Sequence, residues 1–460
     1  MNVPQQSLSH SQAIARWAVG DAVRQAPAPA RELAARALLD TLAVTLLGSR
    51  LAGPRILAGV ELASSETRQA TVFGMGCRTS VQTAALINGC SAHADLFDDN
   101  SGPMIAHPSA PLFSALLPLA QERNRAGAEL VDAYIAGIEV GVGLGRALNP
   151  GLYERGWHVT EVLGVIGTTV ACCRLLSLGE ARTAHAIGIA VSMAAGVRQN
   201  FGTMTMGLHV GRTARDAVHA ALLAEAGFES DPLSLEGKYG LARTFAATNL
   251  DMLVLGSPFE LMRSGLIFKK YPSGAPTLAA IDASLALRAK YGADVSLIAE
   301  VHCLVHRWNA MTLREEEPRD MLQAKVNLRF CVACAFVYGE VTWRQFTQAT
   351  LEDPRIRSFM SRISVRIGHE LPDSDEFPAE VRIIATDGTQ TSERREVPSG
   401  GSTRPLTDEE LRAKFRDCAR PVFADESMGD AIDTILAIDH LPDVGKLCIR
   451  LEGMSIRLET

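Results

Sequence analysis

The densest group of ionisable side chains lies between residues 88 and 111, in NGCSAHADLFDDNSGPMIAHPSAP. Small residues precede this group and an apolar run follows it, which predicts a buried setting. Buried ionisable groups are costly unless they are paired or used in chemistry. The alternative interpretation is an acidic surface loop with two incidental histidines. The group consists of His93, Asp95, Asp98, Asp99, Asn100 and His107.

Other positions carry side chains that could move a proton or bind an anion. His158 lies in GWHVTE just before a predicted helix, and His209 lies between two glycines in GLHVG. A histidine can transfer protons near neutral pH. Lys269 and Lys270 precede a Tyr-Pro pair, and a lysine that faces a closed cleft offers a charge for a carboxylate or an amine of lowered pKa. The alternatives are histidines that only pack and two solvated lysines before a turn.

The sequence contains no motif for a metal or a nucleotide. It has no H-E-x-x-H segment. Its C-x-x-C segment, Cys331 to Cys334, lies in the apolar helix-like run NLRFCVACAFVYG, where core packing is the better interpretation. No glycine-rich fingerprint follows a predicted strand. We therefore expect neither a metal nor an organic cofactor.

Composition excludes several classes of function. The chain has 460 residues, of which 47% are hydrophobic and 21% charged, as in ordinary globular proteins, and this length predicts two domains. A formal net charge of −7 without a basic block argues against a nucleic-acid partner. No run is apolar enough to span a bilayer, and the N-terminus lacks the features of an export signal. We expect a cytoplasmic protein with no membrane partner.

The elements that position these residues change in character along the chain. From about residue 10 to 260, apolar residues recur three and four apart, as in ARELAARALLDTLAVTLLG, which Gly48 ends. After about residue 265, alternation in SLIAEVHCLVH, RISVRIGHEL and EVRIIATDGTQTSERREV predicts strands, the last with an Asp-Gly hairpin turn. Helical patterns at 276–291 and 321–338 lie among these strands.

A helical pattern returns near the C-terminus. Residues 398–405 (PSGGSTRP) are typical of a linker, and residues 407 to about 437 are again helical in pattern. These patterns predict a mainly α fold. A large all-helical domain (1–265 plus 405–460) carries a smaller inserted α+β domain (266–404). A small-ligand site is expected in the cleft between such domains.

The histidine-rich segment resembles a family signature. The MmgE/PrpD family usually shows NG-x-x-x-H-x-x-D-F-D-D-T followed by H-P-S, and it includes 2-methylcitrate dehydratase, cis-aconitate decarboxylase and iminodisuccinate epimerase. Four more segments resemble the family in the same order: GWHVTEVLGVIG, NFGTMTMGLHVGRTAR, IFKKYPSGAPTLAAIDA and AKVNLRFCVACAFVYGEV. The resemblance implies a helical domain with an α+β lid, a site between them, chemistry without metal or organic cofactor, and a homodimer.

The resemblance also implies roles for individual residues. His107, His158 and Lys269 match active-site positions of the family, and Asp98 joins them as a candidate catalytic group. The remaining candidates are expected to bind the substrate: Asp99, Asn100, His209, Arg212 and Tyr271.

Several positions depart from the family pattern. Leu96 stands where the first acid of D-F-D-D-T is expected, with Asp95 one residue earlier, and Asn100 replaces the threonine. Met206 replaces a lysine, for which Arg212 is the candidate substitute. Phe330 stands where the lid helix often has an aromatic hydroxyl, and one extra residue precedes His107. Losing cationic and hydroxyl groups suits a smaller, less charged or more apolar substrate, or a loss of activity.

The resulting hypothesis is a metal-independent lyase similar to 2-methylcitrate dehydratase. It would act on a small carboxylic acid by removing a proton next to a carboxylate and eliminating water. His158 or Lys269 is the expected base, and His107 or Asp98 the expected acid. The alternatives are a decarboxylase or epimerase acting on a related carboxylate, and a catalytically silent relative that binds one.

Overall fold

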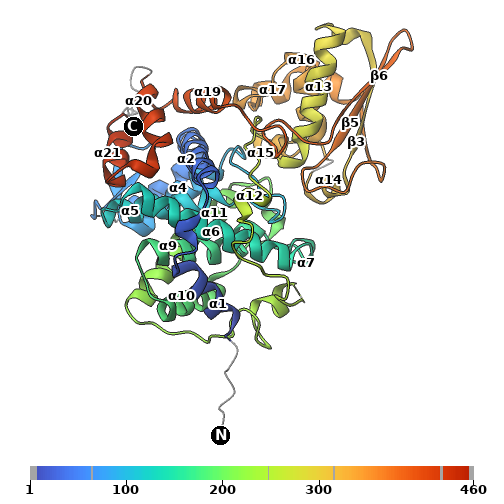
Figure 1. The fold of residues 1–460 in the computed structure, drawn as a ribbon. Helices are drawn as coiled ribbons and strands as arrows, with labels where there is room; N and C mark the ends of the chain where they lie inside the picture. The colour runs from blue at the N-terminus through green and yellow to red at the C-terminus, as the bar shows by residue number, and fades with distance from the viewer. Residues whose placement is uncertain (1–7, 64–65, 247, 314–315, 425–427, 455–460) are drawn as a thin grey trace.

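Helices dominate the computed structural model, which describes residues 8–63, 66–246, 248–313, 316–424 and 428–454. Helices take 58% of the chain and strands only 9%. Figure 1 shows a large helical body with a smaller α+β part beside it. The predicted mainly α fold with a smaller α+β part is therefore confirmed. None of the described helices is both long and apolar enough to cross a membrane. Residues 1–7, part of the N-terminus in which we expect no export signal, lie outside the described ranges.

The helical body is built around α2 (Ala28–Gly48), whose alanine and leucine side chains are buried on nearly every side. Because these side chains are small or apolar, neighbouring helices pack all around α2, and the helix ends at Gly48 as predicted. The other helices of this part are α1 (His10–Val19), α3 (Ala52–Leu62), α4 (Val81–His93), α5 (Ser109–Glu122), α6 (Gly127–Leu148), α7 (Gly151–Glu154), α8 (Val159–Val162), α9 (Gly164–Leu175), α10 (Glu180–Met193), α11 (Met204–Glu225) and α12 (Glu260–Arg263).

One feature of the body was not predicted. β1 (Ala70–Val72) and β2 (Cys77–Thr79) form a two-stranded antiparallel sheet, with Ala70 opposite Thr79. The expectation that this part is all helical is therefore wrong in this detail. Strands of three residues are too short for a period-two pattern to stand out in a sequence.

Helices α4 and α11 pack closely enough to fix two histidines. A Cβ added to Gly89 of α4 would lie 2.8 Å from the Cα of Gly211 of α11. Only glycine permits this approach, since any side chain would force the two backbones apart. α4 ends at His93 and α11 carries His209, so the close packing fixes both histidines relative to each other.

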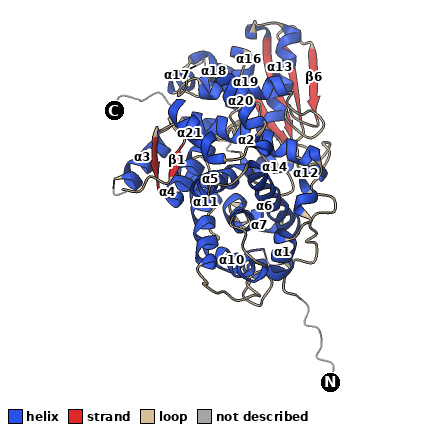
Figure 2. Ribbon diagram, turned by 60° about the vertical axis from the view of Figure 1, so that its left-hand side comes forward, coloured by secondary structure: helices blue, strands red, loops and turns tan. Residues whose placement is uncertain are grey.

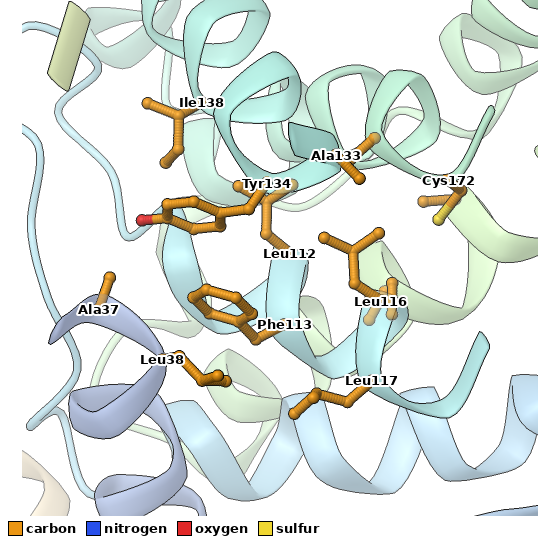
Figure 3. Close-up of a cluster of buried hydrophobic side chains, with 14 of the residues drawn as sticks. Ala37, Leu38, Leu112, Phe113, Leu116, Leu117, Ala133, Tyr134, Ile138 and Cys172 are labelled. Atoms are coloured by element: carbon orange, nitrogen blue, oxygen red, sulfur yellow. The ribbon is translucent and has the colours of Figure 1, made fainter. Parts of the chain in front are cut away.

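The core beside α2 has a polar edge. The rings of Phe113 on α5 and Tyr134 on α6 stack with centroids 4.3 Å apart. In Figure 3 the Tyr134 hydroxyl points away from the apolar side chains around it. It lies 2.7 Å from the Ser109 hydroxyl, at the first residue of α5. The apolar core thus borders a buried pair of hydroxyls, from Tyr134 and Ser109, next to the histidine-rich loop.

The smaller part is a four-stranded mixed sheet covered by helices. The strand order is β4-β3-β5-β6, with β3 and β4 parallel and the other pairs antiparallel. Val301 of β3 lies opposite Ile363 of β4 and Ile383 of β5. The Asp387–Gly388 turn joins β5 to β6, with Gly388 at φ 86°, so the predicted hairpin is confirmed. The strands are β3 (Ile298–Val305), β4 (Ile363–Ile367), β5 (Ala379–Ala385) and β6 (Gln390–Arg395).

Helices cover one face of this sheet, as Figure 2 shows for α13 (Leu278–Tyr291) and α16 (Leu328–Tyr338). Alternate residues of β5 are buried against them. Cys331 and Cys334 are buried free thiols in α16, as the core-packing interpretation predicts. The remaining helices here are α14 (Arg307–Thr312), α15 (Met321–Lys325), α17 (Gln348–Glu352) and α18 (Pro354–Met360).

The chain then returns to the helical body. α19 (Asp408–Ala419) packs on α2, and its Leu411 and Phe415 join the core of the body. Figure 1 shows α19 running between the α+β part and the last helices, α20 (Met428–Leu436) and α21 (Val444–Met454). The predicted helical pattern after residue 407 is confirmed outside residues 425–427, which the structure does not describe.

A buried ion pair joins the two parts. Lys325 of α15 lies 3.0 Å from the carboxylate of Asp95, and both side chains are almost fully buried. The Lys325 ammonium also donates to the carbonyl of Pro272 and lies 4.0 Å from the centre of the Phe346 ring. Removing one partner of a buried pair leaves an uncompensated charge.

We therefore predict that Lys325→Met lowers the free energy of unfolding by about 3–5 kcal/mol. Lys270→Met, which breaks an exposed pair with Glu410, should cost about 0–1 kcal/mol. Denaturant unfolding measures both. The added substitution Asp95→Leu should recover much of the loss in the Lys325 variant. Equal effects of the two lysine variants would contradict the assignment.

Candidate active site

A sharp turn after α4 presents the acidic residues. α4 ends at His93, and Leu96 then adopts a left-handed φ of 53°. Asn100 pairs with Ile267 through two backbone hydrogen bonds of 2.8 and 2.9 Å. This bridge lines up the loop with the segment that carries Lys269. Residues more than 150 positions apart in sequence thus meet in one place.

Asp98 lies at the centre of the group. Its carboxylate accepts a hydrogen bond from His93 Nδ1 at 2.8 Å. His107 Nδ1 lies 3.7 Å and Lys269 Nζ 3.9 Å from the same carboxylate. Burial alone would raise the pKa of Asp98, but His93, His107 and Lys269 hold it below its usual range. Asp98 is therefore a carboxylate at neutral pH.

Lys269 is fully buried and donates to the carbonyl of Leu96 at 2.8 Å. Burial lowers its pKa to about 8, with Asp98 opposing that shift and Lys414 adding to it. Lys269 is thus a cation at neutral pH, yet it gives up its proton more readily than an ordinary lysine.

His107 has a defined tautomer. Its Nδ1 lies 2.7 Å from the carbonyl oxygen of Asp99, and a carbonyl can only accept, so Nδ1 carries the hydrogen. Burial lowers the pKa of His107 to about 3. The ring is therefore neutral at ordinary pH, and its Nε2 has a free lone pair that can accept a proton.

His158 and His209 form a second pair. Their Nδ1 atoms lie 3.0 Å apart, so one donates to the other. Burial lowers the pKa of His209 to about 4 and that of His158 well below its usual value. Glu161 lies behind the pair, 3.7 Å from His209 Nδ1, and burial raises its pKa to about 7.

Lys414 of α19 links the two backbone segments that carry Asp98 and Lys269. Its ammonium donates to the carbonyls of Phe97 and Lys269, each at 2.9 Å. It also lies 2.6 Å from the buried carboxylate of Asp40 on α2. Lys414 thereby holds the loop before Asp98 and the segment of Lys269 in fixed register.

Four of the predicted site residues line a small cavity of about 60 Å³: His107, His158, Lys269 and Asn100. Asp98 lies beneath the wall and His209 behind His158. The other lining residues are His93, Leu96, Ile105, Tyr153, Thr160, Phe201, Met206, Gly274, Ala275, Pro276, Thr312, Val326 and Phe377.

Backbone strain gathers around this cavity. Leu96, Ile105 and Phe377 adopt φ angles of 53°, 52° and 56°, although none is glycine, and all three line the cavity. Each such conformation costs on the order of 1–3 kcal/mol and persists where the surrounding structure enforces it. This clustering is typical of functional sites.

Sequence comparisons match nearly the whole of this architecture. Residues 12–251 match the MmgE/PrpD N-terminal domain, and residues 271–438 match the MmgE/PrpD C-terminal domain. The chain belongs to the MmgE/PrpD family. The C-terminal match includes α19 and α20, although these helices pack in the core of the helical body.

Relatives of known name cover most of the chain. Cis-aconitate decarboxylase of Homo sapiens is 27% identical over 91% of this chain and 90% of its own length. The protein of the same name from Mus musculus is 26% identical over 92% and 89%. That from Aspergillus terreus is 24% identical over 94% of both chains.

Four residues expected to bind substrate do not line the cavity, and one of them, His209, lies behind His158. Asp99 is buried under α5, where Ser109 donates to it through both its hydroxyl and its backbone nitrogen, and burial raises its pKa to about 7. The Ser109 side chain therefore bonds Asp99 at the start of α5. The partners of the other two residues are Asp282 for Tyr271 and both Glu161 and Asp216 for Arg212.

The departures from the MmgE/PrpD pattern differ in their consequences. Leu96 and Met206 line the cavity, so each places an apolar side chain at the site. Phe330 packs against Phe346 in the core of the α+β part and does not line the cavity. Arg212 and Lys270 are turned to other partners, so neither occupies the place of Met206.

His93 is the residue that sequence reasoning left without a role. It lines the cavity, it donates to Asp98, and its Nε2 is buried without a hydrogen-bond partner among the described residues. Its ring centroid lies 4.7 Å from that of His107. The spacing His93-x-x-x-x-Asp98, with a helix end between the two, is the signal that could have found it.

His93, Asp98 and His107 also have spacing that could hold a metal ion. The same atoms already have partners, however. Both Nδ1 atoms donate to oxygen, and the Lys269 ammonium lies on the carboxylate. A divalent cation would have to displace Lys269 or compete with its charge. The donor set is better accounted for as a hydrogen-bonded acid–base group.

We predict that His107 is a neutral Nδ1–H tautomer at neutral pH and remains neutral at about pH 5. NMR of the ring nitrogens in histidine-labelled protein measures both the tautomer and the charge. His107→Gln identifies the signal by its loss. An imidazolium signal for His107 at neutral pH would rule out the role of free base.

Proposed function

We propose that the protein is a metal-independent lyase acting on a small polycarboxylic acid. The observation that carries this proposal is the pairing of a buried ammonium, Lys269, with a neutral imidazole, His107, on the wall of one cavity. The ammonium can bind a carboxylate and supply a proton, and the imidazole can accept one.

Binding of the acid rests on a donor without another partner. The Nδ2 of Asn100 is buried and has no hydrogen-bond partner among the described residues. Such a group is costly to bury empty, so a ligand oxygen at this atom is favourable. Together with Lys269, Asn100 offers a carboxylate both charge and direction.

The charge states support a division of the proton-transfer roles. Lys269 is protonated at neutral pH and His107 is not, so Lys269 acts as the acid and His107 as the base. This proposal differs from the expectation from the sequence, in which His158 or Lys269 is the base and His107 or Asp98 the acid. Asp98 is an anion that does not line the cavity, so it positions His93, His107 and Lys269 instead of donating a proton.

Decarboxylation is the reaction we place first, because the similar proteins named above are cis-aconitate decarboxylases. The bond from carbon to one carboxylate breaks and carbon dioxide leaves. The electron pair of the broken C–C bond forms a new double bond to the adjacent carbon. The pair of the original double bond moves to its far carbon, which takes the proton from Lys269. No base is needed, and the imidazoles orient the acid.

Dehydration, as the sequence predicted, is the second candidate, because the site holds a base as well as an acid. His107 would take the proton next to a carboxylate, the C–H electron pair would form the double bond, and Lys269 would protonate the departing hydroxyl. His158 lies on the same cavity wall and can share the base's role.

One experiment distinguishes decarboxylation from dehydration. We expect carbon dioxide release from cis-aconitate, or alkene formation from citrate or 2-methylcitrate, by protein treated with a chelator. Lys269→Met should lower kcat by roughly 10²–10⁴-fold in either case, whereas His107→Gln should do so only for dehydration. Lys270→Met serves as the matched control. No turnover and no solvent deuterium uptake with any acid would overturn the proposal.

The pH dependence tests Lys269 directly. Because its pKa is lowered from the usual 10.5 to about 8, the ammonium form is lost as pH rises through about 8. We predict that kcat falls over that interval. Lys269→Arg keeps its charge at these pH values, so it should remove this fall while lowering kcat. An alkaline fall that persists unchanged in the arginine variant would exclude Lys269 as its source.

A further inference from the structure

We propose that a second cavity beside the site holds an apolar substituent of the substrate, so that the enzyme prefers alkyl-substituted polycarboxylates. This inference rests on the proposed function and specifies its substrate class. The second cavity has a volume of about 470 Å³ and lies between the helical body and the α+β part. Its apolar wall includes Leu47, Leu51, Pro54, Cys90, Met204 and Phe346.

The buried charges on this wall are paired with each other. Asp95 and Lys325 form the buried ion pair that joins the two parts. Arg50 is exposed and donates to the carbonyl of Pro421. A second polycarboxylate head would therefore find the buried cation Lys325 already paired, whereas an alkyl chain would meet apolar side chains.

Two residues lie between the cavities. His93 and Met206 line both the small cavity and the large one. The small cavity, about 60 Å³, is much smaller than the large one, about 470 Å³. A polycarboxylate that places its reacting carbon at Lys269 must extend beyond it, and Met206 offers a thioether as the boundary over which an apolar group passes.

This arrangement predicts how rate depends on chain length. Each methylene buried in the large cavity should raise kcat/KM by about fourfold until the cavity is filled. An entrance channel, the rival interpretation of the same cavity, would give no such increase. The two interpretations thus differ in the slope against chain length.

The variant that fills the cavity is Gly53→Leu. Gly53 lies on α3 and lines the cavity, and a Cβ there would meet Met204 Cβ at 3.4 Å. Gly59 lies on the same helix, and a Cβ there would meet nothing within 4 Å. Gly59→Leu is therefore a matched control for the effect of leucine on the helix.

The experiment compares cis-aconitate and citrate with their methyl, butyl and hexyl derivatives. Wild type and Gly59→Leu should favour the longer acids, and Gly53→Leu should lose that preference at least tenfold while turning over the unsubstituted acids as before. Equal loss on every acid in Gly53→Leu, with thermal unfolding unchanged, would support a channel and overturn the inference. A flat dependence on chain length in wild type would also overturn it.

A failure of the proposed function can be distinguished from a failure of the apolar-subsite inference. If wild type turns over none of these acids, calorimetric binding of the same series decides the role of the cavity. Affinity that rises with chain length in wild type and in Gly59→Leu, but not in Gly53→Leu, would support the apolar subsite. Affinity that does not rise would overturn it.

Discussion

A buried carboxylate organises this molecule. Asp98 carries its negative charge in a setting where an unpaired ion is very costly. The cost is offset by the proton that His93 donates and by the nearby Lys269 ammonium, with His107 close by. These groups come from the end of α4, the loop before α5 and the segment after α12. The charge of Asp98 therefore favours an arrangement that brings these three backbone segments together.

The two parts of the molecule are joined by the same kind of interaction. Lys325 reaches across to Asp95, and Lys414 reaches from α19 to Asp40 and to two backbone carbonyls. Each lysine is buried and donates hydrogen bonds to specific oxygens. Each therefore fixes the relative position of the segments that it contacts more than it adds net stability. Met206 and apolar side chains near it line the larger cavity between the two parts.

The sequence was most informative where structure is local. The helical period identified α2, and the Asp387–Gly388 turn identified the hairpin between β5 and β6. Family motifs located His107 and Lys269. Partners distant in sequence could not be predicted: Lys414 and Phe97 are 317 positions apart, and no periodicity links them. For the same reason Tyr271 was assigned to the substrate, although its hydroxyl donates to Asp282 within the α+β part.

The position of Lys414 has a consequence for synthesis of the protein. Phe97 and Lys269 leave the ribosome well before α19, yet their carbonyls are held together by an ammonium that α19 supplies. The register of the loop before Asp98 and the segment of Lys269 is therefore completed only after α19 has been synthesised and has packed on α2. A chain that lacks α19 lacks the ammonium that holds these two carbonyls together.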